Sequence, residues 1–161
     1  MEDILLALKE TGFATAMREH ETLFPWMEAT HVLAIAAVVG TISIIDMRLM
    51  GLPAHRKSVR QLMKDVLPLT WVAFVIAVIS GFLLFSAQPV KYFALWEFKA
   101  KMGLLLLAGL NMVYFHMVTF RNVHLWDELA STPPAAKIAG LLSLTLWIGV
   151  VIFGRVLGFV L

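Results

Sequence analysis

Residues 29–50 read ATHVLAIAAVVGTISIIDMRLM, an apolar run of helical length that decides the fold of this 161-residue chain. Three further apolar runs occupy 66–87, 100–120 and 136–161. An α-helix rises about 1.5 Å per residue and the hydrocarbon core of a bilayer is about 30 Å thick, so each run is long enough to cross it. Only helices satisfy all their backbone groups within one spanning segment. The sequence therefore predicts an all-α membrane protein with four transmembrane helices.

The segments between these runs are short: they read LPAHRKSVRQ, QPVKYFALWEF and NVHLWDELASTPP. Short connections place consecutive helices side by side and antiparallel, so we expect an up-down-up-down bundle. Pro133 and Pro134 should end the last connection and begin the fourth helix. The ends of the spans carry tryptophans, as membrane interfaces do: Trp26, Trp71, Trp96 and Trp126.

The composition agrees with a single integral membrane domain over 1–161. Hydrophobic residues make up 60% and charged residues 15%, whereas soluble domains have about half and about a quarter. The net charge of +2 is too small to indicate a nucleic-acid partner. The absence of cysteine excludes disulfides, thiolate metal sites and thiol catalysis. The sequence also lacks the motifs of a nucleophile elbow, a phosphate-binding loop or an HExxH zinc site.

Residues 3–20, DILLALKETGFATAMREH, place apolar side chains at helical spacing among charged ones. The segment is too polar to cross a bilayer, so we expect one amphipathic helix lying in the membrane surface. The alternative is a surface helix packed on the end of the bundle. The acidic start MEDILLALK is unlike a secretory signal, which carries positive charge there.

The connection after the first span carries a dense group of basic residues: Arg48, Arg56, Lys57, Arg60 and Lys64. Positively charged connections, early ones above all, usually stay in the cytoplasm. We therefore expect a multi-pass protein of a bacterial inner membrane with both termini outside the cytoplasm.

Ionisable side chains inside spans are costly in hydrocarbon, so each is a candidate functional residue. Fifteen residues separate His31 from Asp46 in the first span, and fifteen separate Lys101 from His116 in the third. These spans run in the same direction, so we expect His31 level with Lys101, and Asp46 level with His116. The sequence thus predicts a His31 layer in the outer leaflet (His31, Lys101, Arg155) and an Asp46 layer in the inner leaflet (Asp46, Arg48, His116).

The His31 layer has the chemistry of a haem site. Neutral imidazole is an axial ligand of haem iron, and helical bundles hold haem between facing helices. Lys101 is a candidate second ligand in its neutral form, and as a cation it would pair with a haem propionate, as would Arg155. Met27, one turn before His31, is a further candidate ligand, and so is His20 if the N-terminal helix folds over the site. A purely structural hydrogen bond of His31 is the alternative.

The Asp46 layer has a simpler interpretation. Asp46 and Arg48 lie near the membrane surface, where they can pair with each other or with headgroups. A hydrogen bond between Asp46 and His116 would account for both side chains. A second haem ligated by His116, with His55 or His124 as its partner, is the alternative.

Nine methionines raise a copper hypothesis, because thioether and imidazole groups bind Cu(I). They are scattered without an MxxM cluster, so most should be packing residues. Gly154 and Gly158 form a GxxxG step in the fourth span, which serves packing within the bundle or the seam of a homo-oligomer.

A group of small bacterial membrane proteins of unknown function resembles this chain over nearly its whole length. The resemblance rests on the first span, HVLAIAAVVGTISIIDMRLMG, and on the third span, FKAKMGLLLLAGLNMVYFH. It includes the segment LFPWMEATH that leads into the first span and the segment WIGVVIFGRVLGF near the end of the chain.

More distantly, the first and third spans resemble those of the HemJ-type protoporphyrinogen oxidases. That family has a histidine in an HVxA-like stretch, a lysine heading a Lys-Leu-Leu-rich helix and a YH pair, which correspond to His31, Lys101 and Phe115–His116. In that family the histidine and the lysine are associated with haem b and activity. The third span also resembles the membrane domain of CopD-type copper-resistance proteins, where a lysine-led helix ends in an asparagine like Asn111.

We therefore expect a haem b-binding membrane protein in electron transfer or redox chemistry, with quinone or a membrane redox partner as electron source. The alternatives are a protoporphyrinogen oxidase-like enzyme, and a copper-handling or structural membrane subunit without a cofactor. A transporter is disfavoured, because the sequence shows neither an inverted repeat nor a broken helix at the midplane.

Overall fold

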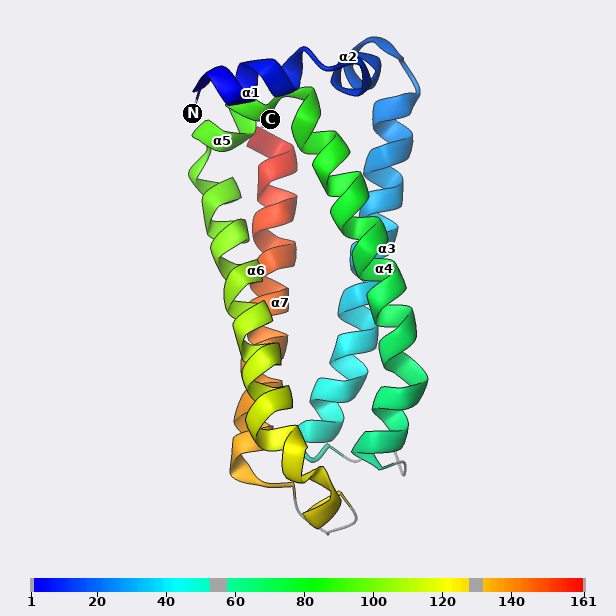
Figure 1. Ribbon diagram of the computed structural model, residues 1–161, viewed down its shortest axis with the longest axis vertical. Coiled ribbons are helices and arrows are strands. Elements are labelled where there is room, and N and C mark those ends of the chain that lie inside the picture. The colour runs from blue at the N-terminus through cyan, green and yellow to red at the C-terminus, as the bar shows by residue number, and fades with distance from the viewer. Residues whose placement is uncertain (1, 53–57, 128–131, 161) are drawn as a thin grey trace.

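The computed structural model describes residues 2–52, 58–127 and 132–160, which form helices joined by short turns (Figure 1). Four long helices make an antiparallel bundle: α3 (Leu23–Leu49), α4 (Val59–Ala87), α6 (Trp96–Tyr114) and α7 (Pro134–Val160). Helix α6 continues through a π-helical turn, η1 (Phe115–Thr119), and a 3₁₀ turn, η2 (Phe120–Leu125). The all-α four-helix fold predicted from the apolar runs is confirmed.

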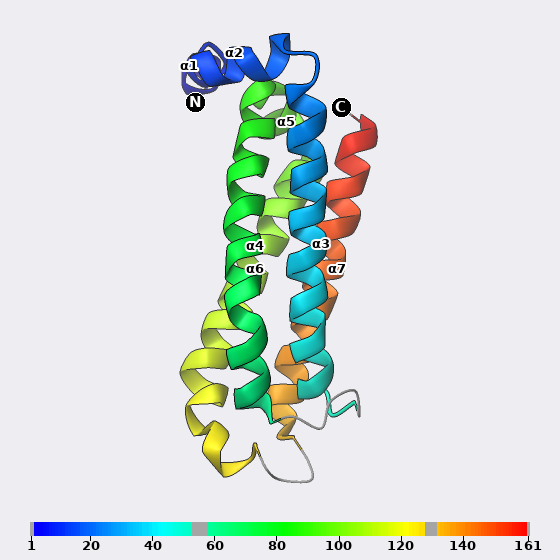
Figure 2. The same cartoon turned by 90° about the vertical axis from the view of Figure 1, so that its right-hand side faces the viewer.

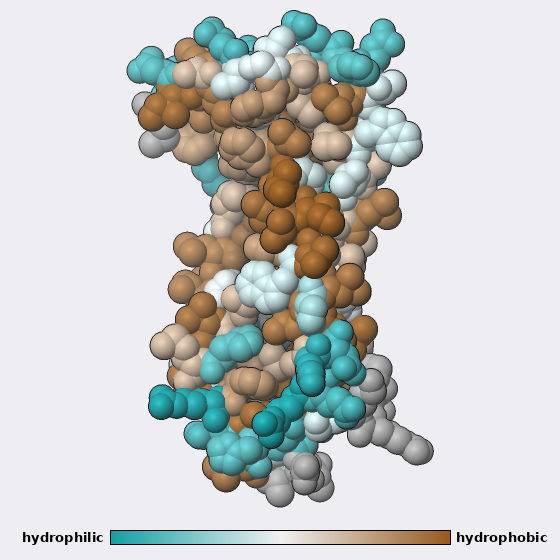
Figure 3. Space-filling model, turned by 45° about the vertical axis from the view of Figure 1, so that its right-hand side comes forward, coloured by the Kyte–Doolittle hydropathy of each residue, from teal (hydrophilic) through white to brown (hydrophobic). Residues whose placement is uncertain are grey.

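Four helices in the described part of the chain are long and apolar enough to cross a bilayer, at 27, 29, 30 and 27 residues with α6 counted to Leu125. In the most apolar stretch of each, only 17–33% of the residues are buried inside the protein. The apolar surface left over needs an apolar solvent, which hydrocarbon supplies. Figure 3 shows hydrophobic residues around the middle of the molecule and hydrophilic ones toward both ends. The chain is therefore a multi-pass integral membrane protein.

The bundle consists of two helical hairpins, α3 with α4 and α6 with α7, which meet along α3 and α7. Gly140 makes the α3–α7 contact close, because a Cβ there would lie 2.9 Å from the Asp46 carbonyl oxygen and 3.0 Å from Leu49 Cβ. On the opposite side, α4 and α6 do not form a comparably packed pair within the described residues. The hairpins are therefore joined tightly along one seam and more loosely along the other.

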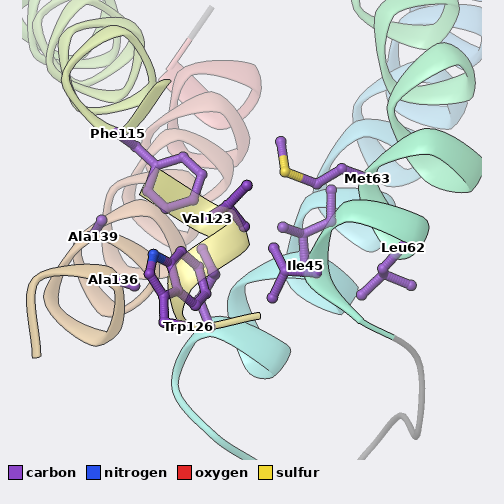
Figure 4. Packing of buried hydrophobic residues seen from close by; sticks show 10 residues of the cluster. Ile45, Leu62, Met63, Phe115, Val123, Trp126, Ala136 and Ala139 are labelled. Atoms are coloured by element: carbon purple, nitrogen blue, oxygen red, sulfur yellow. The ribbon is translucent and has the colours of Figure 1, made fainter. Parts of the chain in front are cut away.

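Buried apolar residues close the end of the bundle away from the termini (Figure 4). Phe115, Val123 and Trp126, from η1, η2 and the turn after it, belong to one cluster with Ile45 of α3 and Met63 of α4. The irregular continuation of α6 thus supplies the apolar side chains that join the two hairpins at this end.

Two side chains hold the first turn of α4. Ser58, the N-cap, accepts a hydrogen bond from the Gln61 N–H at 3.2 Å through its Oγ. The buried carboxylate of Asp127 accepts from the N–H of Val59 at 2.5 Å and from that of Arg60 at 3.3 Å. These bonds satisfy amides that a helix leaves unpaired in its first turn, and they tie the end of the third span to the second.

The N-terminal segment forms two short helices, so the single helix predicted for 3–20 is wrong. Helices α1 (Glu2–Lys9) and α2 (Gly12–Glu19) are separated at Thr11, whose extended backbone (φ −66°, ψ 148°) interrupts the helix. Both lie across the end of the bundle that carries the two termini (Figures 1 and 2). Helix α2 packs on α4, and α1 contacts α5 (Pro89–Ala94), a short helix inside the second connection. The segment therefore packs on the end of the bundle, and its position in the membrane surface stays a prediction.

Candidate functional site

The imidazole of His31, on α3, is fixed against α4. Its Nδ1 lies 3.0 Å from Ser80 Oγ. The Ser80 hydroxyl also lies 2.7 Å from the Ile76 carbonyl; when it donates there, its Oγ accepts and the ring Nδ1–H is the donor. A neutral ring with its proton on Nδ1 keeps a lone pair on Nε2. With Nδ1–H as the donor to Ser80, the ring can ligate a metal through Nε2.

Gly81, the next residue on α4, provides the space for the ring. A Cβ at this position would lie 2.8 Å from His31 Cε1 and 3.3 Å from Nδ1, so any larger residue would displace the imidazole. Ser80 was not identified from the sequence, because a hydroxyl in a membrane helix usually bonds its own backbone. An adjacent serine and glycine within an apolar span is the pattern that could have pointed to it.

Lys101, on α6, lies close enough to His31 for a charge on its amine to act on the imidazole. The common layer expected from the equal spacing stays a prediction. Its side chain lies against α7, where a Cβ at Gly154 would be 3.4 Å from Nζ and 3.6 Å from Cε. Nζ makes no hydrogen bond or ion pair to any residue that the structure describes.

Glu97, one turn before Lys101, is a buried carboxyl that the sequence gave no reason to single out. It is 7% exposed, and its Oε2 has no hydrogen-bond partner among the described residues. The i, i+4 spacing puts Glu97 and Lys101 on one face of α6. The structure therefore adds two polar groups, Ser80 and Glu97, to the surroundings of His31 and Lys101.

The other residues predicted for this site have partners elsewhere. Arg155 is exposed, with its guanidinium carbon 4.5 Å from the centre of the Phe159 ring on its own helix. Met27 packs on an apolar cluster formed by α2 and α4. His20 is exposed, and its Nδ1 lies 3.2 Å from Thr22 Oγ1. Packing and local contacts account for all three without a ligand.

The Asp46 layer does not assemble as predicted. The buried carboxyl of Asp46 has Ser143 of α7 as its side-chain hydrogen-bond partner, and its Oδ2 has none among the described residues. The ring of His116 lies 2.8 Å, through Nδ1, from the Met112 carbonyl of its own helix. The predicted Asp46–His116 hydrogen bond is therefore wrong. His116 belongs to the π-helical turn η1, in which side chains do not follow the rotation of an α-helix.

The remaining polar residues of the spans link helices or lie at the surface. Asn111 Nδ2 donates to the Ala139 carbonyl at 3.0 Å and joins α6 to α7. Arg48 Nη1 lies 3.5 Å from Thr132 Oγ1, just before α7. Of the two candidates for a second haem, His124 is exposed in η2 and His55 lies outside the described residues.

Gly154 and Gly158 do not share one open face. The Cβ position of Gly154 is covered by Lys101, whereas that of Gly158 has no atom within 4 Å. Gly154 therefore serves packing inside the bundle. In the parts of the chain that the structure describes, no group of three or more His, Cys, Asp or Glu side chains is placed to hold a metal ion.

Helix α5 is held to the bundle by aromatic packing. The Tyr92 ring lies 6.0 Å from that of Phe85 and 5.9 Å from that of Phe98, centre to centre. Burial, and secondly the nearby carboxylate of Glu28, raise the pKa of the Tyr92 phenol above its ordinary value. The phenol is therefore neutral at physiological pH and acts as part of the apolar packing.

Comparison with known proteins identifies no relative: no family, no curated protein and no solved structure matches this chain. The resemblances to small bacterial membrane proteins, to HemJ-type oxidases and to CopD-type proteins stay predictions. What fold and composition establish is an integral membrane protein of four spans, with His31, Ser80 and Lys101 as its candidate site.

Proposed function

We propose that this protein binds haem b beside His31 and takes part in electron transfer or redox chemistry within the membrane. The observation that carries the proposal is the contact of His31 Nδ1 with Ser80 Oγ at 3.0 Å, which holds the ring against α4; with Nδ1–H as the donor, Nε2 keeps its lone pair. A histidine that ligates a metal typically donates its other ring nitrogen to a nearby acceptor, which fixes tautomer and ring orientation. His31 is the proposed axial ligand of the iron.

Lys101 supports the proposal in two ways. Its neutral amine would serve as a second nitrogen ligand for the iron, and its ammonium form would pair with a haem propionate. Either role suits the amine of a half-buried lysine that makes no hydrogen bond or ion pair within the described residues. Arg155 is a further propionate partner only if its guanidinium leaves the Phe159 ring.

Bound haem b would supply one-electron chemistry at this depth of the bilayer. The chain would hold it through His31, with Ser80 fixing the imidazole and Gly81 leaving space for it. A quinone or a membrane redox partner is the proposed source of electrons. The dense basic group after the first span supports an inner-membrane location with both termini outside the cytoplasm.

The proposal is tested by the visible absorption spectrum of the protein purified in mild detergent, first oxidised in air and then reduced with dithionite. We expect a sharp Soret band that shifts on reduction, with resolved α and β bands. His31→Ala should abolish these bands. His116→Ala is the matched control and should retain them, because that ring bonds the Met112 carbonyl of its own helix and packs on the neighbouring Phe115 and Phe120 rings. A featureless spectrum after haemin is supplied during expression, or full haem content in His31→Ala, would overturn the proposal.

Two further measurements separate this function from its alternatives. Complementation of a strain lacking protoporphyrinogen oxidase would identify an oxidase-like enzyme rather than an electron carrier. Metal analysis of the purified protein would identify a copper-handling protein if copper is present without haem. With neither copper nor haem, a structural membrane subunit is the remaining interpretation.

A further inference from the structure

A second polar site lies at the end of the bundle that carries the termini, between the N-terminal helices and α5. A pocket of about 420 Å³ is lined there by Lys9, Arg18, Gln88, Val90, Lys91 and Ala94. Three of these described residues are basic and none is acidic. The volume falls in the range of about 300–1,000 Å³ that is typical of small-ligand sites.

Arg18 is held in a defined position at this pocket. Its Nη1 donates to the carbonyl of Lys9 at 2.7 Å and to that of Ala87 at 3.4 Å, the last residues of α1 and α4. Its Nη2 donates to Thr15 Oγ1 at 3.1 Å. A guanidinium has more N–H donors than these contacts use, and one that is fixed in advance loses little entropy when it binds an anion.

The other pocket residues favour an anion as well. Lys9 brings a second positive charge from α1 and Lys91 a third from α5, and the Gln88 amide is a neutral donor. An anion placed between Lys9, Arg18 and Lys91 is attracted by the positive charge of each. Val90 and Ala94 give the pocket an apolar wall, which suits a ligand that has carbon as well as charge.

The position of the pocket indicates the source of the anion. Helices α1 and α2 lie across the end of the bundle, beyond the apolar middle of the four spans (Figures 1, 2 and 3). That is the level of the membrane surface, where lipid phosphates are concentrated. We propose that this pocket binds the phosphate of an anionic phospholipid, with Lys9, Arg18 and Lys91 pairing with its headgroup. The bound lipid fastens α1 and α2 to α5 and to the end of α4.

Native mass spectrometry of the full-length protein, titrated with phosphatidylglycerol or with phosphatidylcholine, tests the proposal. We expect the wild type to retain phosphatidylglycerol in preference. The triple variant Lys9→Gln/Arg18→Gln/Lys91→Gln should bind it about tenfold more weakly or worse. The matched variant Lys64→Gln/Lys99→Gln/Arg121→Gln removes the same number and kind of charges outside the pocket, and should bind like the wild type.

Because Arg18 also bonds the ends of two helices, the double variant Lys9→Gln/Lys91→Gln tests the charges alone if the triple variant does not fold. The proposal is overturned if this double variant retains as much phosphatidylglycerol as the wild type, or if the wild type retains both lipids equally. Calorimetric titration with inorganic phosphate distinguishes the source of the anion. Phosphate binding that needs the same residues, without any preference for phosphatidylglycerol, would assign the pocket to a soluble anion. That result would overturn the proposal that the pocket binds a lipid.

Discussion

At the end of the bundle near Asp46, Gly140 lets α7 lie against the backbone of α3, with its Cβ position 2.9 Å from a carbonyl oxygen. At the end near His31, Gly81 and Gly154 lie instead against side chains, the imidazole of His31 and the amine of Lys101. A glycine that meets backbone brings two helices together. A glycine that meets a polar side chain makes space for that side chain inside the bundle, which is what a binding site needs.

The two histidines of the spans show the same contrast. His31 bonds a different helix through Ser80, whereas His116 bonds the Met112 carbonyl of its own helix. A ring held by a neighbouring helix keeps its orientation as part of the tertiary structure. A ring that bonds only its own turn contributes little to how the helices are arranged. The comparison therefore assigns the candidate site to the His31 end and a packing role to the Asp46 end.

Gly140→Ala should have the largest effect on stability. Its Cβ would press on the Asp46 carbonyl oxygen and Leu49 Cβ, which move aside only if α3 and α7 separate. We expect the free energy of unfolding, measured by chemical denaturation in mixed micelles, to fall by about 1–3 kcal/mol. Gly103→Ala is the control, because its Cβ would have no atom within 4 Å. Equal stability of Gly140→Ala and wild type would contradict the close α3–α7 contact.

Asp127→Ala should have the next largest effect, because it removes the two carboxylate oxygens that accept from the N–H groups of Val59 and Arg60. Loss of a side chain that caps a helix costs about 0.5–2 kcal/mol, and the burial of Asp127 favours the upper half of that range. Asp127→Asn keeps one oxygen for the Val59 N–H and should lose less. If both variants unfold like the wild type, the carboxylate does not hold α4.

The four spans could be predicted from the sequence because a bilayer demands a minimum length of apolar helix, which each run satisfies. The start of α7 at Pro134 was also predictable, since proline fits the first turn of a helix. The break at Thr11 was not, because the periodicity of the apolar residues continues across it. A break of this kind depends on what the two short helices pack against, and that is a tertiary effect.

The candidate site could be predicted only in part, and the reason lies in helix geometry. His31 and Lys101 lie in regular α-helix, so their proximity could be expected from residue counting. Counting could not predict the hydrogen-bond partner of His116, because its ring bonds the Met112 carbonyl of its own helix rather than Asp46. Ser80 and Glu97 could not be ranked from sequence, since their importance comes from burial and from the residues that neighbouring helices bring to them.

Gly81→Ala should cost less stability than Gly140→Ala, about 1 kcal/mol, because a side chain can shift where a backbone cannot. Its effect should instead appear at His31, whose Cε1 would lie 2.8 Å from the new Cβ. We expect the imidazole nitrogen NMR signals of His31 to lose the signature of a hydrogen-bonded Nδ1–H. If His31 binds haem as proposed, the haem content of the purified Gly81→Ala variant should also fall.

Gly154→Ala is the matched variant for this comparison. Its Cβ would meet the end of a flexible lysine at 3.4 Å, so Lys101 can adjust and the His31 signals should stay as in the wild type. Unchanged His31 signals in Gly81→Ala would show that the ring does not lie against α4. Equal changes in both variants would show a general loss of packing at this end rather than a contact specific to His31.

The smallest effect is expected between the two ends, where the Thr70 hydroxyl donates to Thr41 Oγ1 at 2.9 Å and joins α4 to α3. The Thr41 hydroxyl donates to the Ala37 carbonyl at 2.8 Å, and the Thr70 hydroxyl has the Val66 carbonyl at 3.1 Å as an alternative acceptor, so the link between helices is only part of what either side chain contributes. A double-mutant cycle with Thr41→Val and Thr70→Val isolates that link, and hydrogen bonds between membrane helices give coupling energies of about 0.6 kcal/mol on average. A coupling of that size would mean that packing holds the α3–α4 hairpin. The His31–Ser80 contact would then act mainly by orienting the imidazole and add little to stability. A coupling well above about 1.7 kcal/mol, the largest found for such bonds, would mean that polar contacts help to hold the α3–α4 hairpin together. The His31–Ser80 contact could then be explained by stability alone, which weakens the case for His31 as a ligand.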